Sequence, residues 1–403
     1  MNTTSATDSA QDLRNQLVDQ LVKDGTLHSP DVESAMRTVP RHLFVPAVSL
    51  ADAYADQAVN IKENPAGGLP LSCASVPTIV AIMLEQLDVR SGDNVLEIGA
   101  GTGYNAALLR ALGATVTTVD IDEDVTTHAR QTLDTTGNGE VEVITADGAL
   151  GHPANAPYDQ IIVTVGAWDI PTAWGDQLRE GGRLVVPLRW RGTTRSVAFT
   201  KVGGRLLAFN LQLCGFVPML GQEGELQAPI TDDGSVLLHW DIDQPIDPAR
   251  IHGVLNQPRR AAWSGTTVGS TEPFDGVWLR MTATEPGTCR IEALPAAVES
   301  GLCKPAIPTR SPALVEGVSL AYFVFRRLKP TDGGSARAEL GAVGHGAAGA
   351  ELAARLCAQI RDWGNNRDAM PALVAVPAGT PAPHPADGYA IDKRESRLFI
   401  HYK

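Results

Sequence analysis

The sequence feature that most restricts the fold is a glycine-rich turn between a predicted strand and a predicted helix. Residues 93–98 are a short, mostly apolar run typical of a buried strand, and Gly99-Ala100-Gly101-Thr102-Gly103 follows directly. A helical pattern then continues to Leu112. Glycines at such a turn let the backbone pass close to a ligand where a side chain would collide. The turn is therefore either a ligand site or merely a tight connection.

Strand-like and helix-like patterns alternate around this turn with short connections, which predicts a doubly wound, Rossmann-like α/β sheet. Two later runs, 196–201 and 206–213, predict an antiparallel hairpin at the edge of that sheet. A helix is expected from Pro30 to Pro40, with Ser29 as its N-cap. The other predicted strands are 115–119, 141–145, 159–165 and 183–188, and the other predicted helices are 12–23, 77–87, 123–133 and 171–178.

The pattern weakens after Gly221, where we expect a second, smaller α+β domain. The predicted domains are therefore 1–220, which carries the glycine-rich turn, and 221–403, which would recognise a substrate or another partner. Strand-like runs are expected at 236–238, 277–279, 320–325 and 398–402. A helix at 351–363 would follow a glycine- and alanine-rich loop at 331–349, and 371–385 would be extended.

Acidic residues at the ends of neighbouring strands favour one ligand over another. Asp120 lies 21 residues past Gly99, where a carboxylate can accept hydrogen bonds from both ribose hydroxyls. Asp147-Gly148 follows a third strand, near the expected position of the adenine. A dinucleotide site is the alternative. However, the turn has the spacing GxGxG rather than GxGxxG, and Glu97 would repel a pyrophosphate. A sulfonium ligand with an ammonium group tolerates that carboxylate, which favours S-adenosylmethionine.

Composition excludes several other classes of function. The formal net charge of −13 argues against broad nucleic-acid binding. The five cysteines are scattered and never spaced as CxxC, which argues against a disulfide framework or a metal site and favours the reducing cytoplasm. The sequence has neither a signal-peptide pattern at its polar N-terminus nor an apolar run of about 18 residues, so we expect no membrane association.

Motifs in the first half of the chain resemble, in order, those of the protein-L-isoaspartate O-methyltransferases. The resemblance covers roughly residues 13–220 and implies a class I methyltransferase that converts S-adenosylmethionine to S-adenosylhomocysteine. The motifs are residues 39–46 (VPRHLFVP), 53–56 (AYAD), 75–77 (SVP), 97–104 (EIGAGTGY), 147–148 (DG), 156–159 (APYD), 177–178 (QL), 181–187 (GGRLVVP) and 216–219 (FVPM).

This resemblance implies roles for individual residues. Ser75 is the catalytic candidate, because its hydroxyl can orient the acceptor carboxylate or the methyl donor. Its hydroxyl could also cap the helix that begins at Pro77, and the two roles are compatible. Asp56 would contact the substrate backbone or support an N-terminal lid, and Val165-Gly166-Ala167 would form the substrate floor. The cofactor-binding set is Ser72, Cys73, Ala74, Ser75, Glu97, Gly99, Gly101, Thr102, Gly103, Asp120, Ile121, Asp147 and Gly148.

Other side chains near these motifs have more ordinary interpretations. Trp168 and Trp174 are expected to pack between helices and sheet rather than to wall a bulky peptide, and His42 is expected to be structural. Arg189, Arg191 and Arg195 form the most basic local stretch, which is usually a solvated hairpin but could attract an acidic peptide.

Three departures from the family pattern refine the predicted substrate. The loop before Ser75 is long, Cys73 replaces the usual threonine, and the chain extends beyond Gly221. These features resemble methyltransferases of ribosomally made peptide natural products of the lanthipeptide, graspetide and FxLD types. That resemblance implies methylation of an aspartate in a modified, macrocyclised precursor peptide, whose ester then forms aspartimide or isoaspartate.

Two alternatives stay open at this point. One is repair of isoaspartyl damage in many proteins, and the other is a binding module that holds S-adenosylmethionine without turnover. The sequence does not determine the oligomeric state.

Overall fold

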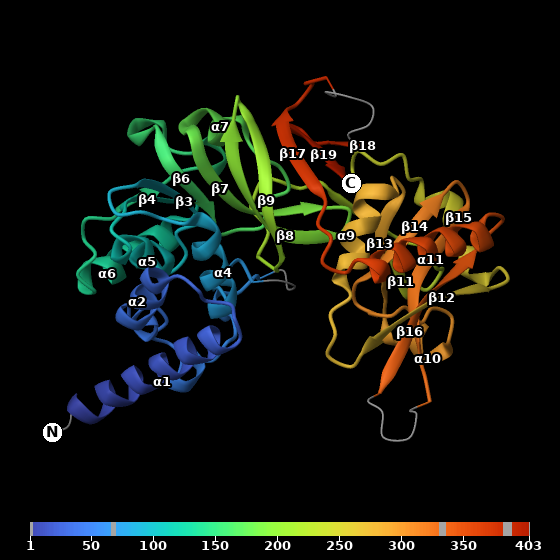
Figure 1. The fold of residues 1–403 in the computed structure, drawn as a ribbon, viewed down its shortest axis with the longest axis horizontal. Helices are drawn as coiled ribbons and strands as arrows, with labels where there is room; N and C mark the ends of the chain where they lie inside the picture. The colour runs from blue at the N-terminus through green and yellow to red at the C-terminus, as the bar shows by residue number, and fades with distance from the viewer. Residues whose placement is uncertain (1–2, 66–69, 330–335, 382–388, 403) are drawn as a thin grey trace.

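The computed structural model describes residues 3–65, 70–329, 336–381 and 389–402. Two β-sheets dominate it, one built mainly by the first half of the chain and one by residues 225–345 (Figure 1). A small β1–β2 hairpin stands apart from both. Within the described residues, no helix has the length and apolar character needed to cross a membrane.

The first sheet has ten strands in the order β18-β19-β17-β9-β8-β7-β6-β3-β4-β5. Its parallel strands are β3 (Asn94–Ile98), β4 (Thr115–Asp120), β5 (Glu142–Thr145), β6 (Tyr158–Val163) and β7 (Leu178–Trp190). The strand order reverses between β3 and β6, and such a switch point opens a crevice at the carboxyl ends of the strands. The connecting helices are α4 (Pro77–Leu87), α5 (Tyr104–Ala111), α6 (Glu123–Thr135) and α7 (Thr172–Gln177). The predicted doubly wound fold is confirmed.

An N-terminal helical cap precedes this sheet. Ser29 caps α2 as predicted, because its hydroxyl accepts a hydrogen bond from the backbone N–H of Val32. The cap contains α1 (Thr3–Lys23), α2 (Pro30–Thr38), the 3₁₀ turn η1 (Arg41–Leu43), α3 (Leu50–Ala53) and the strands β1 (Val59–Lys62) and β2 (Ser72–Ala74). The long loop noted before Ser75, which the sequence predicts at 64–70, falls partly on residues 66–69, and these lie outside the described residues.

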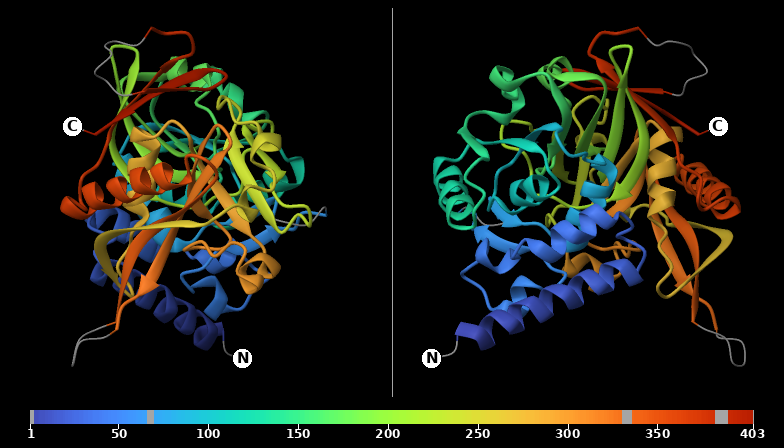
Figure 2. Two further views of the ribbon diagram at one scale, coloured as in Figure 1. Left: turned by 90° about the vertical axis from the view of Figure 1, so that its right-hand side faces the viewer. Right: turned by 60° about the vertical axis from the view of Figure 1, so that its left-hand side comes forward.

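The C-terminal strands return to the first sheet, which the sequence did not predict. β17 (Ala372–Pro377) pairs with β9 (Arg205–Leu213), and β19 (Ser396–His401) and β18 (Tyr389–Asp392) extend the sheet further. Figures 1 and 2 show these red strands beside β9. The predicted hairpin of β8 (Thr193–Val202) and β9 is therefore antiparallel as expected but not at the sheet edge. By sheet pairing, residues 221–403 are likewise not one continuous unit.

The second sheet has seven strands, all antiparallel, in the order β10-β11-β13-β14-β15-β16-β12. Helix α11 (Gly349–Asn365) packs on β12, β15 and β16. The strands are β10 (Glu225–Pro229), β11 (Val236–Asp241), β12 (Arg260–Gly269), β13 (Thr288–Ala293), β14 (Ser311–Glu316), β15 (Ser319–Arg327) and β16 (Arg337–His345). The shorter helices are α8 (Pro248–Ile251), α9 (Asp275–Thr284) and α10 (Pro295–Ser300).

Two predictions for this region are wrong. The run 277–279 belongs to helix α9, where short apolar runs in strands and helices look alike. The glycine- and alanine-rich stretch is largely strand β16 rather than a loop; its residues 331–335 lie outside the description. Small residues serve close packing there, since a Cβ on Gly344 would lie 1.8 Å from the carbonyl oxygen of Gly349 at the start of α11.

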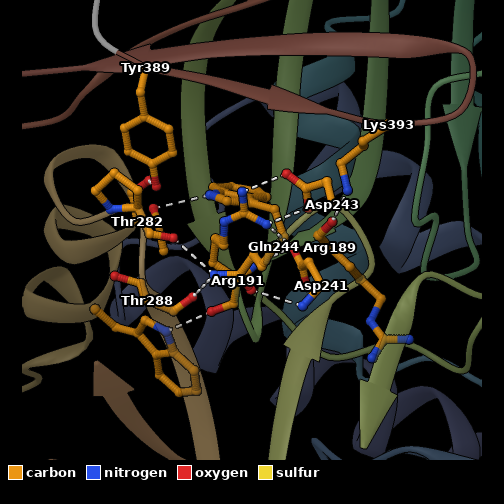
Figure 3. Close-up of polar contacts among 12 residues, drawn as sticks. Arg189, Arg191, Asp241, Asp243, Gln244, Thr282, Thr288, Tyr389 and Lys393 are labelled. Atoms are coloured by element: carbon orange, nitrogen blue, oxygen red, sulfur yellow. Dashed lines mark hydrogen bonds and ion pairs between the residues drawn. The ribbon is translucent and has the colours of Figure 1, made fainter. Parts of the chain in front are cut away.

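Buried charges join the two sheets. Arg191, in the turn between β7 and β8, pairs with Asp241 and Asp243 at 3.1 and 2.6 Å, as Figure 3 shows. Arg195 pairs with Asp275 at 2.6 Å, and Arg189 lies 3.6 Å from Glu225. The expectation of a solvated arginine hairpin is therefore wrong, because Arg191 and Arg195 are buried against acidic residues of the second half.

Candidate active site

A cavity opens at the carboxyl ends of β3 and β4, beside the switch point of the first sheet. Its walls come from the β2 segment, the glycine-rich turn and residues 216–220. Of the predicted set, the lining includes Ser72, Cys73, Ala74, Ser75, Glu97, Gly99, Gly101, Thr102, Asp120, Ile121, Asp147, Gly148 and Val165. Four predicted residues, Asp56, Gly103, Gly166 and Ala167, do not line it.

The turn after β3 has a shape that only glycine adopts without strain. Gly99 has φ +102°, and a Cβ there would lie 2.6 Å from the hydroxyl of Thr164. That hydroxyl donates a hydrogen bond to the Gly99 carbonyl oxygen at 2.7 Å. Gly103 has φ +82° and is the N-cap of α5, so it shapes the turn from outside the cavity. The backbone is thereby held close to the space that a ligand would fill.

Glu97 is a fully buried carboxyl group at the end of β3. It accepts hydrogen bonds from the Asn105 amide at 2.8 Å and the Thr118 hydroxyl at 2.6 Å. Burial raises the pKa of Glu97 to about 7, against the opposing effect of these two bonds. A carboxyl group with this pKa can lose its proton, and so become negatively charged, when a cationic ligand binds. No pattern in the sequence marks Asn105 and Thr118 as hydrogen-bond partners of Glu97.

Asp120 and Asp147 are held by backbone N–H groups at the ends of their strands. Asp120 accepts bonds from Gly101 N–H at 3.3 Å and Asp122 N–H at 3.1 Å, and burial raises the pKa of Asp120. Asp147 accepts from Ala149 N–H at 2.9 Å. Next to it, a Cβ on Gly148 would lie 2.6 Å from the Ile98 side chain, so glycine is required by packing.

Ser75 stands at the cavity with its hydroxyl free. No hydrogen bond of this hydroxyl occurs among the described residues, and the N-cap of α4 is Val76, without a side-chain capping bond. The alternative role of Ser75 as a helix cap is therefore not realised. Its backbone oxygen accepts a hydrogen bond from Arg41 at 2.8 Å. Arg41 lines the same cavity but was noted in the sequence only as part of a motif.

Asp56 supports a helix in this structure. Its carboxylate accepts bonds from the N–H of Thr78 at 2.9 Å and from the Thr78 hydroxyl at 2.6 Å, which satisfies the first turn of α4. This contact to α4 is neither of its two predicted roles, which were substrate contact and support of an N-terminal lid.

The predicted substrate floor is only partly exposed to the cavity. The N–H of Gly166 donates to Val217 at 2.7 Å, and the N–H of Ala167 donates to Pro187 at 2.9 Å. These backbone groups therefore join the floor to neighbouring segments, and Val165 is the member that lines the cavity.

The aromatic residues and His42 pack as expected. Trp174 is buried and donates from its indole N–H to Gly148 at 2.8 Å. Trp168 is buried beneath the ammonium of Lys393, which lies 3.4 Å from the ring centre. His42 shares a 2.8 Å hydrogen bond with the Tyr54 hydroxyl.

Comparison with known proteins identifies the first half of the chain. Residues 11–224 match the profile of the protein-L-isoaspartate(D-aspartate) O-methyltransferases (PCMT). The chain belongs to this family. A protein-L-isoaspartate O-methyltransferase from Methanoculleus marisnigri is 41% identical over 211 residues, which are 52% of this chain and 93% of the relative. One from Methanoregula boonei is 40% identical over 213 residues, 53% of this chain and 95% of the relative.

A solved structure shares the fold over nearly the whole length. It is named protein-L-isoaspartate O-methyltransferase, covers 97% of this chain and 99% of its own, and has 20% identity and a TM-score of 0.50. The second sheet is thus not peculiar to this chain. The predicted family, fold and S-adenosylmethionine cofactor are confirmed: this is an S-adenosylmethionine-dependent carboxyl O-methyltransferase.

The cavity suits that cofactor chemically. The glycine-rich turn leaves room along the backbone, Asp120 can accept hydrogen bonds from the ribose hydroxyls, and the buried Glu97 matches a cationic ligand. Among the described residues, no group of three His, Cys, Asp or Glu side chains could hold a metal ion.

Proposed function

We propose that this enzyme methylates the free carboxyl group of isoaspartyl residues in proteins and peptides. The observation that carries the proposal is the unpartnered hydroxyl of Ser75 at the cavity, beside a glycine-rich turn in a family named for this reaction. S-adenosylmethionine, when bound, supplies the methyl group. A carboxylate with an ordinary pKa near 4 is already ionised at neutral pH, so its attack needs no general base.

The residues then have simple tasks in this mechanism. Ser75 donates a hydrogen bond to one acceptor oxygen and thereby aims the other. The cavity lining contains neither histidine nor lysine among the described residues, and the Glu97 carboxyl group in it is engaged by Asn105 and Thr118, which suits a reaction without proton abstraction. Rate acceleration rests on alignment of the two reactants, an effect worth on the order of 7–11 kcal/mol in well-oriented systems. We further propose that the predicted cofactor set binds S-adenosylmethionine, with Gly103 acting through the shape of the turn.

A second candidate is methylation of an aspartate in a macrocyclised precursor peptide, followed by aspartimide formation. Cys73 in the cavity wall and the second sheet support it. The second sheet is weak support, because a protein named as an isoaspartate methyltransferase has the same overall fold. The repair-type reaction is therefore the main proposal.

Mass spectrometry after incubation with S-adenosylmethionine tests both candidates. The acceptors are an isoaspartyl peptide, its normal aspartyl counterpart and a cyclised aspartyl precursor peptide. We expect a methyl group on the isoaspartyl peptide alone. Methylation confined to the precursor, followed by loss of water, would overturn the main proposal in favour of the second candidate. Binding without any transfer would leave only a binding module.

Ser75→Ala is the matched variant for this assay. We expect kcat/KM to fall about ten- to a hundredfold, because a hydrogen bond to a charged group contributes roughly 1.5–3 kcal/mol. The melting temperature should not change, since this hydroxyl has no partner among the described residues. An unchanged kcat/KM would remove Ser75 from the mechanism.

A further inference from the structure

Arg41 is a buried cation in the wall of the active-site cavity. The 3₁₀ turn η1 carries it beneath the β2 segment, and only 1% of the residue is exposed. Its guanidinium also lies over the ring of Tyr104, 5.1 Å from the ring centre. The side chain is therefore fixed by its surroundings and cannot move its charge into bulk water.

The hydrogen bonds of Arg41 all go to neutral backbone oxygens. Nε donates to Ala53 at 3.0 Å, and Nη2 donates to Ser75 at 2.8 Å and to Ala74 at 3.5 Å. Nη1 is buried and has no hydrogen-bond partner within the described part of the chain. No carboxylate pairs with Arg41 among the described residues, although a buried charge normally requires an opposite charge.

None of the described neighbours of Arg41 forms an ion pair with it. Burial raises the pKa of Tyr104 to about 12 and also raises the pKa of the Cys73 thiol, so both stay neutral at pH 7. The charge of Asp56 favours the protonated guanidinium of Arg41, but its carboxylate oxygens bind Thr78 at the start of α4 and not Arg41. Burial lowers the pKa of Arg41, but a guanidinium remains protonated in proteins. The cavity wall therefore holds a buried positive charge that no carboxylate of the described residues contacts directly.

We propose that Arg41 is a specificity-determining residue, which selects an ionised carboxyl group over its neutral amide as the methyl acceptor. The acceptor that Ser75 orients lies next to the backbone oxygen bound by Arg41, so its negative charge balances the buried cation. An amide of the same shape leaves the cation unbalanced. This inference rests on the proposed function, because it assigns to Arg41 the recognition of the same acceptor group.

The test compares two peptides that differ only at the acceptor. One carries isoaspartate and the other carries isoasparagine, and their dissociation constants are measured in the presence of S-adenosylhomocysteine. We expect the wild-type enzyme to prefer the carboxylate at least about tenfold and Arg41→Met to prefer it less than about twofold, since a charge pair in a partly buried site is weakly screened. Arg41→Lys, which keeps the charge, should retain most of the preference.

A matched control separates charge from folding. Arg183 also lies over an aromatic ring, that of Phe209, and donates to a backbone oxygen, that of Gln86, but it does not line the cavity. Arg183→Met should therefore leave the preference unchanged. If Arg41→Met fails to fold, Arg41→Gln, which keeps a donor for the backbone of Ser75, serves the same comparison.

Two results would overturn the inference. One is a wild-type enzyme that binds both peptides equally, and the other is a neutral Arg41 variant that keeps the tenfold preference. Failure of the proposed function is distinguishable, because the wild type would then not methylate the isoaspartyl peptide at all. In that case the same comparison is made with an aspartate and asparagine pair in whichever peptide the enzyme does methylate.

Discussion

At the scale of single residues, the active-site cavity places charge where water cannot reach it. Glu97 is fully buried, with hydrogen bonds from Asn105 and Thr118 as its only polar contacts among the described residues. Arg41, which lines the same cavity, has no carboxylate partner among the described residues. Such groups destabilise the free protein, and a ligand of the right charge relieves part of that cost.

Glu97 makes stability depend on pH in a direction that can be measured. Its pKa rises from an ordinary 4.5 to about 7 on folding, so the folded state holds the proton more tightly. The stabilisation of the folded state by protonated Glu97 is fully present below pH 4.5 and is lost as the pH rises through 7. Glu97→Gln should therefore be more stable than the wild type at pH 8, by up to about 3 kcal/mol.

Thermal unfolding of the ligand-free protein between pH 4.5 and 8.5 checks this. The advantage of Glu97→Gln should shrink steadily toward the acidic end of that range. A constant difference across the range would mean that Glu97 has the same pKa in the folded and unfolded states.

At the scale of elements, helix α4 shows how one residue can be assigned from its contacts. The sequence allowed Ser75 either to cap this helix or to orient the reactants in the cavity. In the structure Asp56, about twenty residues earlier, binds the first turn through Thr78, and Ser75 remains free for the cavity. The helix start and the acceptor site are thus kept separate.

Replacing Asp56 should affect stability rather than substrate binding. Asp56→Ala removes the acceptor for Thr78 N–H, and loss of such a cap costs about 1 kcal/mol. Asp56→Asn keeps an acceptor oxygen and should recover most of that stability, which urea unfolding can measure. The KM of Asp56→Asn for the isoaspartyl peptide should stay within about twofold of the wild type. A tenfold rise in KM at unchanged stability would assign Asp56 to the substrate instead.

At the scale of the whole molecule, a buried polar junction joins the two sheets. Arg191 pairs with two aspartates of the second sheet and its following turn, and the indole of Trp190 donates to the Thr282 hydroxyl on α9 at 3.0 Å. Lys393, from the C-terminal hairpin, lies above the same aspartates and donates to the Arg189 carbonyl at 2.9 Å (Figure 3). Three separate parts of the chain meet there.

Breaking this junction should be costly. Arg191→Met leaves Asp241 buried without its partner, which typically destabilises a protein by about 3–5 kcal/mol. The double variant with Asp241→Asn should lose less stability than the two single changes summed. Arg110→Met, which removes an exposed pair with Glu140, is the control and should cost less than about 1 kcal/mol. Equal effects of Arg191→Met and Arg110→Met in urea unfolding would contradict a stabilising junction.

The fold of the first half of the chain could be predicted from the sequence alone. Strand and helix periods, the Gly99–Gly103 turn and the acidic residues at strand ends are local patterns, because each follows from spacing along a few residues. These patterns predicted the doubly wound sheet, and in the structure most of the cofactor set lines one cavity. The family resemblance added Ser75, which no local pattern distinguished from a helix cap.

Tertiary structure alone decided the features that depend on distant contacts. β17 joins β9 across some 165 residues, and such pairing leaves no mark in the local sequence. The sequence predicted a solvated cluster for Arg191 and Arg195, because their acidic partners lie about 50 and 80 residues further along the chain. The missing partner of Arg41 is likewise a property of its surroundings. The burial of a residue and the balance of charge around it depend on every residue close to it in three dimensions, and only folding brings those residues together.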